Sequence, residues 1–294
     1  MNGFGLRADI LRRLAVLPLV VGLLLTADLS GAWAQGAGDL VVTPTRVVLE
    51  GRERAAQVKL ANRGSAAATF RISLIAMHMD DNGQVTEIEP GEHGVQVAGD
   101  MIRYAPRQIT IAPGATQVVR LSVRKPSDLA DGEYRSHMFF RAVPDESAGR
   151  SVADDDNLQD NELRIQLIPI YGITIPVIVR HGDLAATAGV QDVAVLPEDD
   201  DGPARVVANL TREGTQSVFG DLIATYTPAS GGSPTVVAQI TRVAVYTPND
   251  SRRVVMPLRL PDGVTMGQGT LDVTYRAVAE DGGGTLASTS IALN

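Results

Sequence analysis

Two histidines and two aspartates near residue 80 are the first side chains that could do chemistry together. His78, Asp80 and Asp81 are close in sequence, and His93 follows shortly after them. Imidazole and carboxylate groups are common protein ligands of zinc and other divalent cations. However, Asp81 begins the sequence Asp-Asn-Gly, which is typical of a tight hairpin turn. We therefore interpret the segment as a turn between two strands and predict no metal site there.

Catalytic and cofactor-binding motifs are absent from the sequence. It has no cysteine, which excludes thiol catalysis, disulfides and cysteine-ligated metals. No P-loop, nucleophile elbow, zinc-protease motif or dinucleotide-binding glycine motif occurs. The acidic runs at 154–156 and 198–201 lack the spaced ligands of a calcium loop, so we interpret them as solvated loops. The sequence predicts a protein that is not an enzyme and needs no cofactor.

Charge and aromatic content narrow the class of partner. The formal net charge is -8 at pH 7, and aromatic residues make up 4% of the chain. Nucleic-acid-binding proteins usually have a basic surface and aromatic side chains that stack on bases. We therefore expect no nucleic-acid partner, and we also expect no small-molecule substrate.

The first 34 residues have the pattern of a secretory signal peptide. Arginines precede an apolar run over 14–25, and small residues flank Trp33 before the expected cleavage after Ala34. The apolar run is shorter than the about 20 residues that a transmembrane helix needs. We expect export of residues 35–294 to the periplasm, with an uncleaved membrane anchor as the alternative.

Apolar residues after residue 40 alternate with polar ones, which is typical of half-buried β-strands. The clearest runs lie at 70–76, 119–123, 254–260 and 271–275. Turns rich in Gly, Pro, Asn and Asp separate such runs. Because an immunoglobulin-like sandwich holds about 100 residues, the sequence predicts an all-β fold of two immunoglobulin-like β-sandwich domains in tandem.

An acidic loop and a long strand mark the expected domain boundary. Residues 145–161 are polar and acidic, which favours a mobile loop, and 162–180 is the longest alternating run in the chain. Its prolines, Pro169 and Pro176, indicate an edge position or a bend. We predict an N-terminal domain over 35–182, closed by this strand, and a C-terminal domain over 183–294.

Several segments of the N-terminal domain occur in a recognisable order. They are a short strand over Val41–Val48, Asn62 after a strand, segments 104–107, 111–114 and 117–121, Asp131–Ser136, and the long final strand. Together they resemble the periplasmic pilus-assembly chaperone family over about residues 39–180. The C-terminal domain resembles the family only in length and β character.

The resemblance implies a chaperone that binds exported pilin-like subunits and supplies the β-strand that each subunit lacks. The long strand would be the donor, with Leu163, Ile165 and Leu167 filling the pockets of the subunit. Tyr171, on the same strand, is a further candidate contact. An outer-membrane usher would receive the subunits, and two free copies could associate through the long strand.

The family also anchors the subunit's terminal carboxylate with a cleft arginine and a lysine. The arginine matches Arg46, whereas the lysine position falls on Gly172. A carboxylate held by one cation instead of two loses a charge-assisted hydrogen bond, worth about 1.5–3 kcal/mol. The chain is therefore identified as a divergent relative.

Alternatives stay open at this point. The apolar face of the long strand either meets a partner or is buried in its own core, and Arg46 is either the anchor or a surface arginine. Arg120 and Glu133 either form an ion pair or are unrelated charges. The alternative function is a non-catalytic structural or adhesive envelope protein. Gly172 favours it, while Arg46 and the long strand favour the chaperone.

Overall fold

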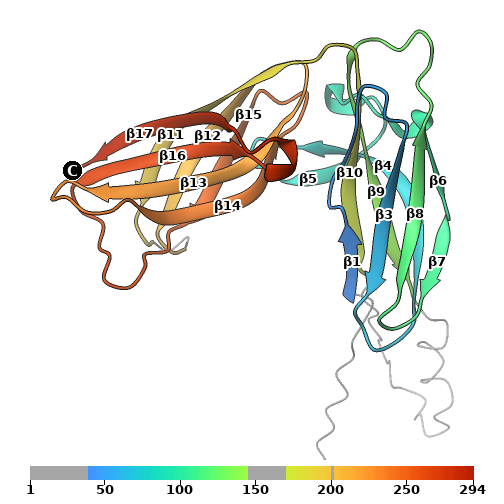
Figure 1. Cartoon of the computed structure of the whole chain (residues 1–294), viewed down its shortest axis with the longest axis horizontal. Coiled ribbons are helices and arrows are strands. Elements are labelled where there is room, and N and C mark those ends of the chain that lie inside the picture. Colours follow the sequence, from blue (N-terminus) through green and yellow to red (C-terminus); the bar gives the residue numbers. More distant parts are fainter. Residues whose placement is uncertain (1–38, 145–169, 200–201) are drawn as a thin grey trace, which may run out of the picture. The chain divides into compact units, whose positions relative to one another are not determined.

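The computed structural model describes residues 39–144, 170–199 and 202–294 (Figure 1). Within these ranges the regular elements are β-strands and three short 3-10 turns, with no α-helix. The described part accordingly offers no helix long and apolar enough to cross a membrane. The expected signal peptide, the expected acidic loop and Leu163, Ile165 and Leu167 lie outside the described residues. All the described residues belong to one compact unit, Ala37–Asn294.

The first sandwich consists of two facing sheets (Figure 1). One has the strand order β1-β3-β8-β6, and the other has the order β2-β10-β9-β4-β5, with β7 also paired to β4. The strands are β1 Leu40–Thr43, β2 Val47–Leu49, β3 Ala55–Asn62, β4 Ala68–Met79, β5 Val85–Ile88, β6 Ile102–Ala105, β7 Gln108–Ile111, β8 Thr116–Val123, β9 Gly132–Val143 and β10 Gly172–His181.

Alternating side chains of both sheets form the core of this sandwich. Leu60 on β3 and Leu121 on β8 meet Phe70 on β4 and Phe140 on β9, and all four are buried. Burial of such a side chain contributes about 1.5–3 kcal/mol. The alternation that identified the strands is therefore the arrangement that fills the core.

Asn62 is a buried polar residue that joins the end of β3 to the turn that follows it and to the end of β7. Its Nδ2 donates to Ala66 O at 2.7 Å and to Ile111 O at 2.9 Å, and its Oδ1 accepts from Gly64 N at 2.9 Å. A buried amide must have its hydrogen bonds satisfied. These bonds explain in physical terms why an asparagine follows this strand.

The second sandwich has a sheet of order β11-β12-β15 and a sheet of order β14-β13-β16-β17. Its core includes Leu222, Tyr226, Val273 and Tyr275, all buried. The strands are β11 Ala186–Leu196, β12 Arg205–Gly214, β13 Val218–Pro228, β14 Thr235–Val245, β15 Ser251–Pro257, β16 Gly269–Ala277 and β17 Thr285–Leu293. The predicted all-β fold of two immunoglobulin-like sandwiches is confirmed.

The short strand expected over Val41–Val48 is divided between the two sheets of the first sandwich, so that prediction is wrong in detail. β1 pairs antiparallel with β3, whereas β2 pairs parallel with β10. Pro44 lies between them and has no N–H to donate to a ladder. The crossover places Arg46 immediately before β2.

A small third apolar cluster joins side chains of the two sandwiches. Met79 and Ile178 come from the first sandwich, and Phe219, Ala244, Tyr246 and Val278 come from the second. Val48 packs against this cluster, on the face of β2 opposite to buried Val47 and Leu49. Because successive side chains of a strand point to opposite faces, Arg46 shares the face of Val48.

Candidate partner-binding site

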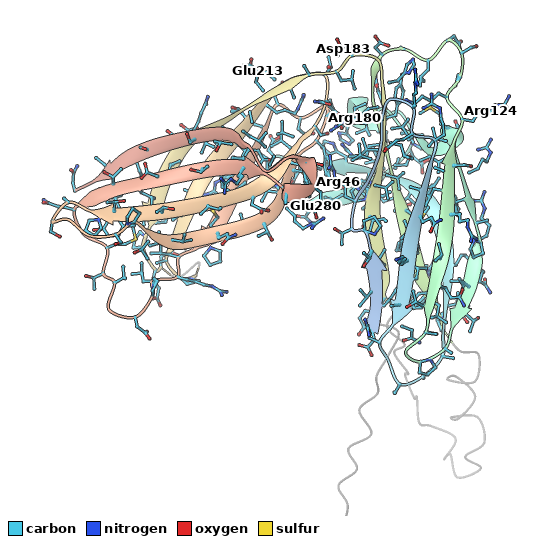
Figure 2. All side chains as sticks on the ribbon, viewed as in Figure 1. Arg46, Arg124, Arg180, Asp183, Glu213 and Glu280 are labelled. Atoms are coloured by element: carbon cyan, nitrogen blue, oxygen red, sulfur yellow. The ribbon has the colours of Figure 1, made fainter. Side chains whose placement is uncertain are left out.

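Arg46 lies against the third cluster, and its side chain is only 8% exposed. Its Nη1 is 3.1 Å from Asp281 Oδ2, and its Cζ lies 4.5 Å from the centroid of the Phe219 ring. Its Nε is buried and has no hydrogen-bond partner among the described residues. Arg46 is therefore a positioned, largely desolvated cation that keeps donor capacity for a further ligand. Figure 2 labels it together with Glu280 and Arg180.

β10 has an edge that is only partly paired. On one side it pairs with β9 along its whole length, Gly172–His181. On the other side β2 covers only Val177–Val179. Among the described residues no strand pairs with 172–176 on that side, and an unpaired strand edge of this kind can accept an added strand.

The position of Arg46 relative to this edge follows from the register. Val47 pairs with Val177 in parallel, so Arg46 lies alongside Pro176. The open edge begins at that point and continues toward Gly172. Pro176 has no N–H, which agrees with the edge position expected from the sequence.

The apolar face of the described part of the long strand is buried in the core of its own sandwich. Ile175, Val177 and Val179 belong to the core of the first sandwich, and Ile173 packs against it. Ile170 and Tyr171, just before β10, are 46% and 51% exposed. Of the candidate contact residues on this strand, the structure thus places Tyr171 at the surface.

Gly172 does not lie beside Arg46. It pairs with Arg141 at the start of β10, and a Cβ placed on it would be 2.2 Å from Phe139 Cε2. Any side chain at this position would therefore require the Phe139 ring to move. The residue next to Arg46 on β10 is Pro176, so the lysine of the family pattern is also lacking at the geometrically adjacent position.

Comparison with known families decides what this domain is. A family model described as pili and flagellar-assembly chaperone, PapD N-terminal domain, matches residues 39–180. Residues 39–180 belong to that family. The resemblance inferred from the sequence over the same residues is confirmed, and we refer to them below as the chaperone domain.

Solved chaperone structures align with most of the chain at low similarity. The YadV chaperone is 16% identical over 87% of this chain and 100% of its own, with a TM-score of 0.41. The Pseudomonas aeruginosa CupB2 chaperone is 13% identical over 86% and 100%, with a TM-score of 0.42. A chain of the CsuC–CsuE chaperone–tip adhesion subunit complex of Acinetobacter baumannii is 13% identical over 86% and 97%, with a TM-score of 0.40. No curated protein matches the chain significantly.

A buried ion pair lies at the end of β10 in the chaperone domain. Glu133, whose side chain is fully buried, has Oε2 3.1 Å from Arg180 Nε and accepts from Ser217 N at 3.0 Å. Its Oε1 accepts from the hydroxyls of Ser217 and Thr247. Arg180 also meets Glu50 at 3.2 Å. This network connects β9 and β10 to the second sandwich.

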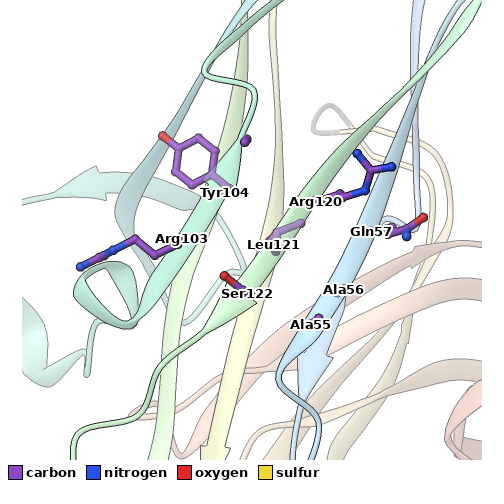
Figure 3. A pocket seen from close by; sticks show the side chains of 9 residues that line it. Ala55, Ala56, Gln57, Arg103, Tyr104, Arg120, Leu121 and Ser122 are labelled. Carbon is purple, nitrogen blue, oxygen red and sulfur yellow. The ribbon is translucent and has the colours of Figure 1, made fainter.

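The alternative pair of Arg120 with Glu133 is excluded by this network. Arg120 is exposed on β8, opposite Gln57 on β3. Both line a shallow hollow of about 510 Å³ together with Arg103, Tyr104 and Leu121 (Figure 3). Glu133 lies in the other sheet, so the two charges are unrelated.

The possible metal ligands near residue 80 do not form a metal site. The rings of His78 and His93 stack with centroids 4.3 Å apart. Asp80 Oδ1 instead accepts from the backbone N–H groups of Asn82 and Gln84, as in a turn. The described residues contain no group of His, Asp and Glu side chains suited to a metal.

Burial on β9 also lowers the pKa of a histidine. His137 is 5% exposed, and its Nδ1 has no partner in the described structure. Burial, assisted by the positive charge of Arg135, lowers the pKa of His137 from 6.5 to about 3. The imidazole is therefore neutral in the folded protein at any pH above that value.

This pKa predicts acid-sensitive stability. Between pH 6.5 and 3 the unfolded chain binds a proton at His137 that the folded chain does not bind, so stability falls as the pH falls through this window. Between pH 7 and 5 we expect a loss of about 2 kcal/mol from this group alone. Urea unfolding at both pH values should show a smaller loss in His137→Gln. An equal pH dependence in both proteins would contradict the assignment.

Proposed function

We propose that the protein is a periplasmic assembly chaperone that binds exported pilin-like subunits by adding its own β-strand to their incomplete sheets. The observation that carries the proposal is the open edge of β10, which begins beside Arg46. A subunit strand along 172–176 would extend the sheet through main-chain hydrogen bonds. Its terminal carboxylate would lie at Arg46.

Arg46 supports the carboxylate contact by its burial and its free donor. A hydrogen bond between a guanidinium and a carboxylate is worth about 1.5–3 kcal/mol. The Nη2 of Arg46 makes no hydrogen bond to a described residue and is available for it. The contact would therefore set the register in which the subunit strand binds.

The residues proposed to contact the subunit through their side chains precede β10 in the sequence. Leu163, Ile165 and Leu167 would fill pockets of the subunit, with exposed Tyr171 beside them.

We place the domain boundary at residues 182–183, between the end of β10 at His181 and the start of β11 at Ala186. Cleavage after Ala34, transfer of subunits to an outer-membrane usher and self-association through the long strand belong to the same proposal. Completion of the subunit's core would provide the free energy, without catalysis or a cofactor.

The alternative is a structural or adhesive envelope protein. The absence of a lysine beside Arg46 favours it, since Pro176 takes that position. In that case the open edge would bind no small subunit.

Recovery of partners from the native periplasm tests the proposal. We expect tagged wild-type protein to co-purify with small exported subunits and Arg46→Gln to recover at least tenfold less, because one charge-assisted bond is lost. Arg124→Gln, which removes an exposed arginine of the same sandwich, is the matched control and should recover as much as wild type. Equal recovery by Arg46→Gln would contradict the carboxylate contact. If a strain shown to express such subunits yields none, the envelope alternative is supported instead.

A further inference from the structure

The turn between β16 and β17 brings carboxylates to the proposed subunit site. This turn contains the 3-10 segment Ala279–Asp281. Asp281 Oδ2 lies 3.1 Å from Arg46 Nη1, and Glu280 Oε1 lies 3.9 Å from Arg242 Nη1. The turn thus places an acid next to each of two arginines.

The two arginines share one aromatic ring. The Cζ atoms of Arg46 and Arg242 lie 4.5 Å and 5.8 Å from the centroid of Phe219. Arg242 has a left-handed backbone, with φ 59°, and its N–H donates to Asp221 Oδ1 at 2.8 Å. A left-handed conformation is unfavourable for a residue with a side chain and persists where its surroundings hold it. Arg242 is therefore held in place near the ring.

Asp281 uses only part of the binding capacity of Arg46. The contact joins it to Nη1, while Nη2 makes no hydrogen bond to a described residue. A guanidinium can hold a carboxylate through two parallel hydrogen bonds. The carboxylate of Asp281 is also 44% exposed, so it remains partly solvated. A ligand carboxylate that accepts from both Nη1 and Nη2 would bind Arg46 better than Asp281 does.

We propose that Asp281 is an intramolecular substitute for the terminal carboxylate of the subunit. It neutralises Arg46 in the free protein and is displaced when a subunit binds. This inference rests on the proposed function, since it requires Arg46 to hold a subunit carboxylate. Each binding event breaks the Arg46–Asp281 pair, which lowers the affinity and favours release of the subunit to the next binding partner.

A peptide probe in two forms tests this competition. The probe is a short synthetic peptide of alternating valine and threonine, prepared with a free C-terminal carboxylate and as its C-terminal amide. The measured quantity is the ratio of acid-form to amide-form affinity, determined by fluorescence anisotropy on the full mature chain. We expect this ratio to rise about three- to tenfold in Asp281→Asn, the range for loss of a competing, partly buried ion pair. Asp262→Asn, on an exposed turn of the same sandwich, should keep the wild-type ratio.

The outcomes separate this inference from the proposed function. A ratio in Asp281→Asn no higher than in wild type, including failure to bind either form, overturns the role of Asp281. In Arg46→Gln the ratio should fall to about one. If it does not, the carboxylate contact of the proposed function is wrong. Asp281→Ser, with thermal melting of each variant, provides a second removal of the carboxylate if Asp281→Asn does not fold.

Discussion

Replacement of Glu133 by alanine is expected to lower the free energy of unfolding by about 3–5 kcal/mol. The side chain of Glu133 is fully buried and lies 3.1 Å from Arg180 Nε. Without it, Arg180 keeps the exposed Glu50 as its one acidic partner among the described residues, and Ser217 loses two hydrogen bonds. Removal of one member of a buried pair costs more than the pair contributes, because the remaining charge stays desolvated. Guanidinium chloride unfolding of the mature chain measures the effect.

Two further variants make this prediction specific. Glu133→Gln keeps the shape and part of the hydrogen bonding, so it should lose less stability than Glu133→Ala. Glu213→Ala removes an exposed glutamate of the second sandwich and should stay within about 0.5 kcal/mol of wild type. If Glu133→Ala also stays within that range, the buried network does not stabilise the fold.

The fold could be predicted from the sequence because strand periodicity and core packing have the same physical origin. Phe70 and Ile72 alternate with polar residues in the sequence, and both are buried in the first core. The division of the first strand was missed because it depends on which sheet each half joins. Pro44 was the available signal, since it cannot donate a ladder hydrogen bond.

The candidate site was less predictable, since its contacts join residues far apart in the chain. Arg46 was found by resemblance, but its pairing with Asp281 depends on how the two sandwiches fold. The partner of Glu133 was also missed. Arg180 is directly opposite it on the neighbouring strand, so a cross-strand search for opposite charges could have found the pair. The position of Gly172 relative to Arg46 could not be predicted, because sequence spacing alone did not give the register of β2 on β10.

A proline on the open edge of β10 is expected to weaken subunit binding while the domain stays folded. Ala142 N donates to Tyr171 O at 2.9 Å. Because the backbone groups of successive residues point to opposite sides of a strand, every second residue counted from Tyr171 bonds to β9. Thr174 belongs to the alternate set of residues, so its N–H faces away from β9, toward the edge that β2 leaves uncovered. Thr174→Pro removes this donor and puts a ring against an added strand, but keeps the ladder to β9. Because the proline removes a main-chain hydrogen bond worth about 0.5–1.5 kcal/mol and its ring also obstructs an added strand, subunit recovery should fall by about tenfold or more.

The stability of the same variant separates strand addition from a general loss of folding. Pro176 already occupies an equivalent position on β10, so the fold tolerates proline on this edge. Thr174→Pro should therefore unfold within about 1 kcal/mol of wild type, since no hydrogen bond to β9 is lost. Thr174→Ala keeps the N–H and is the matched control, with wild-type recovery expected. Full recovery by Thr174→Pro would mean that subunits do not bind along this edge, and Arg46 would then have to hold them by another geometry.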